Sequence, residues 1–449
     1  MREDTSRALE LAVRAAQADR VPGIVAAVVR DGEIAWSSAL GLATVEPAEP
    51  ETLDHQHRIG SITKTFTAVA IMQLRDAGAL DLDDSLGAHV PEAAKADLGI
   101  RRMLSHLSGI QGEPPGAVWE TLDFPSGSEL VAGLAEATMV SAPGRRWHYS
   151  NLAFALLGEV VERASGLPYE RYVTERILTP LGLERTGFTP DAPVAVPYLV
   201  DPWSDVLHVE PAFADESLAG AAGSLWSTAA DLCRWCAFLA EPDPAVLAPA
   251  TLDEMCELQA MLDPESWSIG WGLGLELWRE GNRILVGHEG ATPGFQACVL
   301  TSRQEKVGAA VVANAGNRST PGRLCAELIT TTLELEPATP DPWTPAGPPP
   351  PELVGALGRW WTEGYELSLG WYGGRLEARM ADDPPDRHPA VFERVEVDVY
   401  RAVSGRQTGE LLKLVRDERG TVVKLYWATY PCTRDPRPFG HSRPLGHPL

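Results

Sequence analysis

The sequence predicts an α+β fold for most of the chain and a separate, all-β domain at its C-terminal end. Two pairs of apolar runs, at residues 22–45 and near residue 310, predict antiparallel strands separated by a long, mostly helical stretch. A proline-rich segment then interrupts the chain, and the residues beyond it alternate between apolar and polar. A chain of 449 residues is also too long for one hydrophobic core, which supports two domains.

The first domain combines strand pairs with helices. Hydrophobic periodicity and turn residues place its elements in order. They are a strand pair at 22–45 that turns at Asp31-Gly32, a helix from Ser61 to about Leu80, mostly helices and loops over 85–290, a second strand pair with a polar turn, and a helix at about 320–334. This order predicts an antiparallel sheet flanked by helices, with a helical subdomain between the two strand pairs.

The second domain follows a linker. We expect the first domain to cover residues 1–336, the linker 337–351 and the second domain 352–449, because proline at the linker's density gives an extended, semi-rigid spacer. Beyond it, Val395-Glu396-Val397-Asp398-Val399 alternates, and GELLKLVRDERGTVVKLYWATY contains a turn at about Asp417–Gly420. This pattern predicts a meander of antiparallel strands that forms a small β-barrel or sandwich.

The charge excludes two classes of partner. The formal net charge is −24, whereas binding to nucleic acid or to an anionic membrane needs a basic face. No run of about 18 apolar residues is present, so no membrane span is expected. The N-terminal stretch lacks the basic and apolar regions of a signal peptide and instead predicts an amphipathic helix, which leads us to expect a cytoplasmic protein.

Cysteine and histidine spacing predicts neither disulfides nor a metal site. The six cysteines form no disulfide framework, and the C-x-x-C of Cys233 and Cys236 falls in a predicted helix without a second pair that would complete a zinc site. His55, His57 and His106 lack metal-ligand spacing such as H-E-x-x-H. We therefore expect reduced cysteines, no metal and no cofactor.

The stretch GSITKTFTA, residues 60–68, holds the most informative pair of residues. Only five lysines occur in the chain, and one of them, Lys64, lies three positions after Ser61. On a helix the two side chains would share one face, so that a buried lysine with a lowered pKa could deprotonate the serine. The alternative is that Ser61 only caps the helix and Lys64 extends into solvent.

Two further motifs complete a pattern. Tyr149-Ser150-Asn151 opens a predicted helix, and GHEGATPGF, residues 287–295, precedes a predicted strand. In this order the three motifs resemble the active site of serine β-lactamases and penicillin-binding proteins. The chain resembles most the branch of class C β-lactamases and D-amino-acid-specific esterases and peptidases, in which the second motif is Tyr-x-Asn and the third is often His-x-Gly. HRIGSITKTFTA, MLSHLSGI and AAGSLWSTAADL support this resemblance.

The resemblance implies a role for each residue of the three motifs. Ser61 would be the nucleophile and Lys64 its base, while Tyr149 would pass protons between nucleophile, leaving group and acceptor. Asn151 would orient Lys64 and the amide of the acyl chain. His288 takes the basic position of the third motif, where it would hold Tyr149 or a carboxylate.

The resemblance also implies the surroundings of the nucleophile. Backbone N–H groups of Ser61 and Ala291 would form the oxyanion hole. Gly223, Gly290 and Arg434 would contact the substrate, although Arg434 is also compatible with an exposed structural role. The expected first domain is thus β-lactamase-like, and the second resembles a lipocalin-like barrel.

The combination of domains narrows the expected function. An S-x-x-K domain without an export signal, followed by a proline-rich linker, a barrel and the stretch YWATYPCTRDPRPFG, resembles the penicillin-binding-protein-type thioesterases. Such standalone enzymes take a nonribosomal peptidyl thioester from a carrier protein and cyclise it head to tail. The alternatives are a cytoplasmic esterase, a D-amino-acid-specific peptidase or β-lactamase-like hydrolase, and a non-catalytic acyl-binding scaffold.

Overall fold

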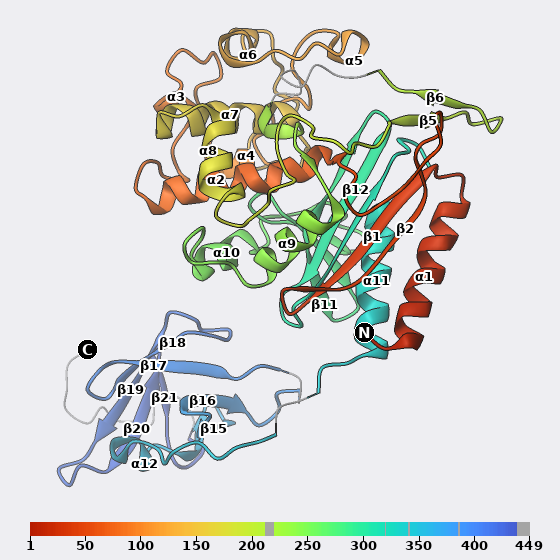
Figure 1. Ribbon diagram of the computed structural model, residues 1–449. Helices are drawn as coiled ribbons and strands as arrows, with labels where there is room; N and C mark the ends of the chain where they lie inside the picture. The colour runs from red at the N-terminus through yellow and green to blue at the C-terminus, as the bar shows by residue number, and fades with distance from the viewer. Residues whose placement is uncertain (212–219, 319, 340–341, 385–386, 438–449) are drawn as a thin grey trace. The chain divides into compact units, whose positions relative to one another are not determined.

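The chain divides into two units, residues 1–338 and 339–449. The computed structural model describes residues 1–211, 220–318, 320–339, 342–384 and 387–437 (Figure 1). Parts of the expected linker and the last residues of the expected second domain therefore lie outside the described residues. Each unit has its own hydrophobic core and is treated by itself below.

The first unit is built on a nine-stranded antiparallel sheet. Its strands follow the order β3-β2-β1-β13-β12-β11-β10-β9-β8. They are β1 (Gly23–Arg30), β2 (Glu33–Thr44), β3 (Glu49–Pro50), β8 (Ala260–Met261), β9 (Ile269–Trp271), β10 (Glu276–Glu280), β11 (Arg283–Thr292), β12 (Phe295–Ser302) and β13 (Val307–Ala313). The predicted α+β architecture is confirmed, with both predicted strand pairs present and the central strand β1 joining them through its pairing with β13.

Strand β1 explains why the sheet is covered on both faces. Ile24 and Val28 face a core shared with α1 (Glu3–Ala18) and α11 (Pro321–Leu335). The intervening Val25 and Val29 face the other core, which the remaining helices of this unit complete. Since side chains alternate along a strand, burial on both faces requires the continuous apolar run that the sequence shows.

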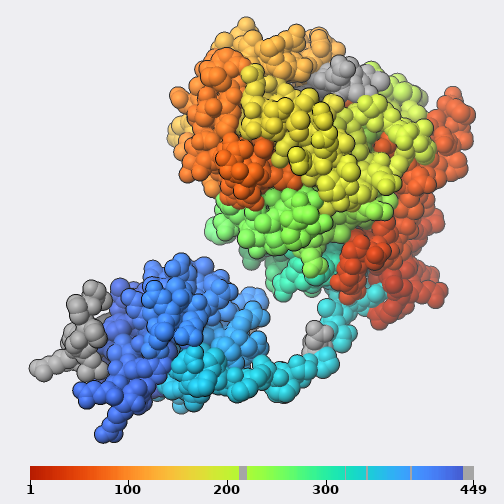
Figure 2. All heavy atoms as spheres, turned by 60° about the vertical axis from the view of Figure 1, so that its left-hand side comes forward, coloured from red at the N-terminus to blue at the C-terminus, as the bar shows by residue number. Residues whose placement is uncertain are grey.

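The helical region inserted between β4 (His57–Arg58) and β8 covers the second face. Figure 2 shows residues of this region, coloured orange and yellow, forming one continuous surface. Its helices are α2 (Thr63–Asp76), α3 (Leu86–His89), α4 (Ile100–Leu104), α5 (Val118–Thr121), α6 (Gly127–Gly133), α7 (Asn151–Ser165), α8 (Tyr169–Val173), η2 (Thr174–Leu178), η3 (Gly220–Ala222), α9 (Ala229–Ala240) and α10 (Pro249–Met255), with the short strands β5 (Tyr198–Val200), β6 (Leu207–Val209) and β7 (Trp226–Ser227) among them.

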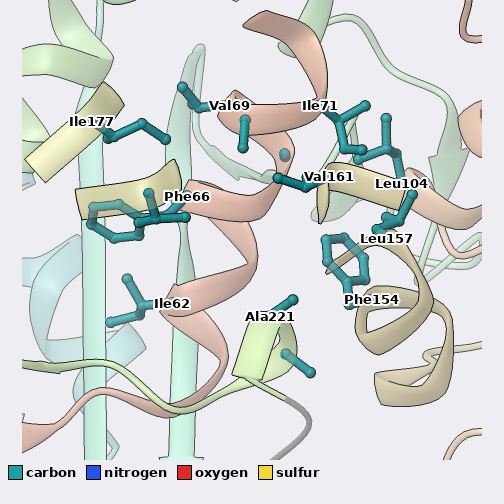
Figure 3. Close-up of a cluster of buried hydrophobic side chains, with 14 of the residues drawn as sticks. Ile62, Phe66, Val69, Ile71, Leu104, Phe154, Leu157, Val161, Ile177 and Ala221 are labelled. Atoms are coloured by element: carbon teal, nitrogen blue, oxygen red, sulfur yellow. The ribbon is translucent and has the colours of Figure 1, made fainter. Parts of the chain in front are cut away.

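Helix α2 runs through the centre of this region. Figure 3 shows Ile62 and Phe66 on one side of it and Phe154, Leu157 and Val161 on the other, where α7 packs. The segment has almost no polar face, because even its threonines and Lys64 are buried. A helix enclosed on all sides holds its N-terminal residues in one position, which is what an active site at that end requires.

Two sequence predictions about the first unit need refinement or correction. The stretch 85–290 consists mostly of helices and loops, as expected, but it ends in β9, β10 and β11, so His288 lies within a strand as well as before β12. Residues 60–62 form a 3₁₀ turn, η1 (Gly60–Ile62), and the α-helix begins only at Thr63. Gly60 has φ +51°, a conformation that does not continue a regular helix backward.

The second unit is a nearly closed antiparallel barrel. A short helix, α12 (Pro351–Val354), precedes eight strands that pair in sequence order from β14 to β21. They are β14 (Gly358–Thr362), β15 (Tyr365–Tyr372), β16 (Arg375–Met380), β17 (Ala390–Glu396), β18 (Val399–Ala402), β19 (Leu411–Arg416), β20 (Val422–Trp427) and β21 (Tyr430–Cys432). A bridge between Trp361 and Thr433 brings the first strand to the end of the last one, which confirms the predicted barrel.

The alternating run at Val395–Val399 was expected to lie in a strand, but it contains the end of β17, a turn and the start of β18. Strand β17 ends at Glu396 and β18 begins at Val399, with Asp398 at φ +58° between them. Val397 is 74% exposed, so the alternation there does not reflect burial of one face.

Candidate active site

The junction of η1 and α2 places Ser61 next to Lys64. The Lys64 Nζ donates a hydrogen bond to the Ser61 Oγ at 2.9 Å and a second one to the carbonyl oxygen of Ala222 at 2.7 Å. The Lys64 side chain is fully buried, so the alternative in which it extends into solvent is wrong. The Ala222 bond ties the base to η3, a segment far from it in the sequence.

Burial gives Lys64 the properties of a base. Removal from water lowers its pKa from 10.5 to about 7, while the charges of Glu113 and Glu276 oppose that shift. A substantial fraction of Lys64 is therefore neutral near pH 7. Its Nζ, 2.9 Å from the hydroxyl, then offers a lone pair to the Ser61 proton.

Tyr149 lies beside both residues at the start of α7. The Lys64 Nζ lies 4.9 Å from the centre of the Tyr149 ring. Burial raises the pKa of Tyr149 above its ordinary value, and a hydrogen bond with the Ser61 side chain opposes that rise. Ser150 fixes this corner, because its Oγ accepts the Ala153 N–H at 3.0 Å and caps α7.

Asn151 contacts a different partner from the expected one. Its Nδ2 donates to Glu113 Oε1 at 2.6 Å, whereas the hydrogen bonds of Lys64 go to Ser61 and Ala222. The expectation that Asn151 orients Lys64 directly therefore needs correction. Asn151 orients Glu113, whose charge in turn acts on Lys64.

His288, from the third motif, is buried in β11 beside Tyr149, with 6.5 Å between the ring centres. Its Nδ1 faces the Glu289 carbonyl oxygen and, at 3.5 Å, the Glu276 Oε1. A carbonyl oxygen only accepts, so Nδ1 carries the proton and Nε2 is left as an acceptor. Burial and the nearby Lys64 lower the pKa of His288 to about 3, which makes the ring neutral.

Two glycines bring the expected oxyanion-hole groups together. A Cβ on Gly290 would lie 1.9 Å from the Ile59 carbonyl oxygen and 3.1 Å from the Ser61 nitrogen. A Cβ on Gly60 would lie 2.7 Å from the Ala291 nitrogen. Strand β11 and η1 therefore approach backbone to backbone, and the N–H groups of Ser61 and Ala291 come from the two touching segments.

A small open cavity adjoins the nucleophile. Gly223 lines it, as expected of a substrate-contacting residue, whereas the contacts of Gly290 are those of the backbone approach between β11 and η1. The lining residues are Ser61, Glu113, Pro114, Trp119, Phe124, Asn151, Ala222, Gly223, Ala291 and Thr292. The wall from the 113–124 segment is apolar except for the Glu113 carboxylate.

Sequence reasoning missed three residues of this site. Glu113 is part of the cavity wall, and burial raises its pKa. Glu276 is buried behind His288, and burial raises its pKa to about 7. The ring centre of His106 lies 4.4 Å from that of Tyr149, and its Nδ1 accepts the Ser150 N–H at 3.1 Å. Only His106 had a signal, since it belongs to the supporting match MLSHLSGI.

Arg434 has a structural environment within the second unit. Its guanidinium lies 3.7 Å from the centre of the Trp360 ring. It also donates four hydrogen bonds, of 2.6 to 3.2 Å, to the carbonyl oxygens of Gly355, Leu357 and Arg359. These contacts fit the structural alternative for Arg434, and its contact with the substrate remains a prediction.

The cysteines also have a structural environment. Cys233 and Cys236 lie in α9 as predicted, and all six cysteines are free. Burial raises the pKa of both thiols. Across the described ranges no group of histidine, cysteine or acidic residues could hold a metal ion. Nor does any helix in those ranges combine the length and apolar character of a membrane span.

Comparisons with known proteins agree with this geometry. The Beta-lactamase family matches residues 9–334, and a domain of unknown function (DUF7586) matches residues 349–434. Penicillin-binding protein 4 of Amycolatopsis lactamdurans is 30% identical over 320 residues, which cover 66% of this chain and 81% of that protein. Esterase EstB of Burkholderia gladioli is 36% identical over 199 residues, 40% of this chain and 50% of that protein. Penicillin-binding protein 4 aside, the chain spans about half the length of the first curated relatives it matches.

Solved structures extend the likeness. A D-stereospecific amidohydrolase from Streptomyces sp. is 28% identical, with a TM-score of 0.62 over 72% of this chain and 98% of that chain. SurE is 26% identical, with a TM-score of 0.59 over 96% of this chain and 98% of that chain, so the likeness includes both units. The chain belongs to the Beta-lactamase family of serine hydrolases.

Proposed function

We propose that this protein is a serine acyltransferase that accepts a nonribosomal peptidyl thioester on Ser61 and releases it by head-to-tail cyclisation. The observation that carries the acyl-enzyme part is the buried Lys64 Nζ at 2.9 Å from the Ser61 Oγ, next to Tyr149. The cyclising part is supported by the two-unit architecture and by the Glu113 carboxylate in the cavity. A carrier protein of a peptide synthetase would deliver the thioester.

Acylation begins at Ser61. Neutral Lys64 takes the hydroxyl proton while the Oγ attacks the thioester carbonyl carbon, and the oxyanion is bound by the N–H groups of Ser61 and Ala291. The C–S bond then breaks, and the leaving thiolate receives a proton through Tyr149. The high pKa of Tyr149 suits it to carry a proton at neutral pH without becoming ionised.

Release of the peptide reverses the proton transfers. The peptide's own N-terminal amine attacks the ester carbonyl carbon and loses a proton toward Tyr149 and Lys64, and the Ser61 Oγ leaves and is reprotonated. Glu113 lines the same cavity as Ser61, so its carboxylate offers a place for the ammonium form of that amine before attack. Intramolecular attack has a large proximity advantage over attack by water.

A second candidate is a hydrolase specific for D-amino acid derivatives. The likeness to a D-stereospecific amidohydrolase and to an esterase favours it, and SurE has been solved with D-Leu. In that case water takes the place of the peptide amine, and Glu113 would hold the free amine of the acylated residue itself. Both candidates use the same acyl-enzyme and differ only in the acceptor.

The test is a matched set of peptidyl thioesters that end in a D-residue or in its L-epimer, with a free or an acetylated N-terminus. We expect mainly cyclic product from the D-ended peptide with a free amine, and little product of either kind from the L-ended one. Mass spectrometry gives the ratio of cyclic to linear product, with the Ser61→Ala variant as control. Linear acid as the main product from every substrate would favour the hydrolase.

A further inference from the structure

The two ends of the C-terminal barrel differ. At one end lie α12 and the turn between β19 and β20, joined by the bond from Arg416 Nη2 to the Glu352 carbonyl oxygen at 2.8 Å. Leu353 and Ala356 of this segment are part of the barrel core. Because the strands alternate in direction, the connections β14–β15, β16–β17, β18–β19 and β20–β21 all lie at the opposite end.

That opposite end contains an open cavity of about 530 Å³. All four connections contribute to it, for example through Tyr365, Met380, Gln407 and Tyr430. Ligand pockets in proteins commonly measure about 300–1,000 Å³ and occur at the mouths of β-barrels. The cavity is therefore large enough for a small ligand, and none of its lining residues belongs to the catalytic unit.

Within the described part of the chain, three side-chain polar atoms of the cavity lining lack partners: the Thr362 hydroxyl, which can donate or accept, and two atoms with a single role. The indole nitrogen of Trp427, a donor, and the Oε1 of Gln407, an acceptor, are both buried, and neither has a hydrogen-bond partner among the described residues. Buried polar atoms are almost always bonded, so such a pair indicates water or a ligand in the cavity.

The chemistry of the walls selects a class of ligand. Ala378, Met380 and Ala390 give the cavity an apolar surface. Its charged lining residues are of both signs: Asp383 and Arg387 form an ion pair at 2.7 Å, and Glu363, Asp382 and Arg406 also line the cavity. A neutral amide satisfies both single-role atoms, because its carbonyl accepts from the indole N–H and its own N–H donates to Gln407. A carboxylate offers no donor to Gln407.

We propose that the open end of the barrel is a binding site for a neutral amide that carries an apolar side chain, such as a residue within a short peptide. This site lies entirely within the second unit and does not depend on the reaction at Ser61. A peptide bound there would be recognised by one hydrogen bond in each direction and by apolar contact of its side chain.

The test uses full-length Ser61→Ala protein, because this substitution prevents turnover. The protein carries ¹⁵N-labelled tryptophan. The probe is the capped dipeptide N-acetyl-leucyl-leucinamide, and the readout is the indole signal of Trp427 in the NMR spectrum, assigned by its loss in Trp427→Phe. Trp343→Phe is the matched control, because Trp343 lies in the linker and is 84% exposed. We expect a saturable shift of the Trp427 signal.

The second part of the test concerns the acceptor atom, Oε1 of Gln407. Gln407→Leu removes the acceptor and should weaken binding about tenfold, the value of one good hydrogen bond, while Gln407→Glu keeps an acceptor and should bind more tightly than Gln407→Leu. Octanoate should shift the Trp427 signal only at much higher concentration. No saturable shift with the dipeptide, equal affinity of wild-type and Gln407→Leu, or equal affinity for octanoate would each overturn the proposal.

Discussion

Two of the cationic side chains that lie against aromatic rings in this molecule, Lys64 and Arg434, differ in what they can do chemically. In the catalytic unit, the Lys64 Nζ lies 4.9 Å from the centre of the Tyr149 ring, and its hydrogen bonds go to one carbonyl and to the Ser61 hydroxyl. In the barrel, the Arg434 guanidinium lies 3.7 Å from the centre of the Trp360 ring, and its hydrogen bonds go to carbonyl oxygens. Burial lowers the pKa of both.

The difference between the two cations lies in their chemistry. A lysine whose pKa falls to about 7 exchanges its proton at neutral pH, whereas a guanidinium stays charged in proteins. The partners also differ, because a hydroxyl can give up a proton and a carbonyl cannot. Burial of a cation beside an aromatic ring therefore does not identify a catalytic residue unless the cation titrates and its partner can react.

The largest expected effect is that of removing the reactive partner. Ser61→Ala should lower turnover at least about 10⁴-fold, since the other groups then have no nucleophile to activate. Labelling by a fluorophosphonate, followed by mass spectrometry, should disappear with it, while the unfolding temperature stays close to that of the wild type. A folded Ser61→Ala variant that stays active, or that is still labelled, would refute the assignment of Ser61.

The next effect tests the cation itself. Lys64→Ala should slow acylation about 10²- to 10⁴-fold at every pH, and Lys64→Arg should not restore it, because a guanidinium carries no lone pair for the serine proton. In the wild type, the pKa of about 7 places the rise of the acylation rate around pH 7, as Lys64 loses its proton with increasing pH. Stopped-flow acylation across pH 5–9 measures both. Near-native acylation by Lys64→Arg would contradict the proposed role.

A smaller effect is expected from the charge that acts on Lys64. Glu113 raises the pKa of Lys64, so Glu113→Gln should lower that pKa and move the rise in acylation to lower pH, by up to about one unit. With an N-acetylated substrate this shift should appear alone. With a free amine, KM should also rise, about tenfold, because the carboxylate no longer meets the ammonium group.

The two substrates separate these contributions. Gln keeps the size of the side chain and can still accept from Asn151, which makes Glu113→Gln a matched change of charge. An unchanged pH profile with the acetylated substrate would argue against electrostatic coupling to Lys64, and an unchanged KM with the free amine would argue against an ammonium site.

The smallest effect on activity is expected at the second cation. Arg434→Ala should destabilise the barrel by about 1–2 kcal/mol, through lost hydrogen bonds and ring contact, and should leave kcat/KM for a small ester unchanged. Denaturant unfolding measures the loss of stability, and a steady-state esterase assay measures kcat/KM. A loss of ester turnover in folded Arg434→Ala protein would show that Arg434 acts at Ser61 after all.

The sequence by itself determined the order of the three motifs, the strand pairs and the change of pattern after the linker. These features are local: a turn at Asp31-Gly32, a serine and a lysine three positions apart, and an alternation of side chains can each be seen in a few residues. The alternation at Val395–Val399 shows the limit of such evidence, since the same pattern occurs in an exposed hairpin turn.

Only the tertiary structure decided which groups surround the nucleophile. The Ala222 carbonyl, Glu113 and Glu276 act on Lys64 from three segments that are distant in the sequence, and no motif marks the two carboxylates. The pKa of Lys64 depends on how completely these segments exclude water and on how closely their charges approach. Desolvation and Coulomb interactions are set by distances in space, which a linear pattern does not contain.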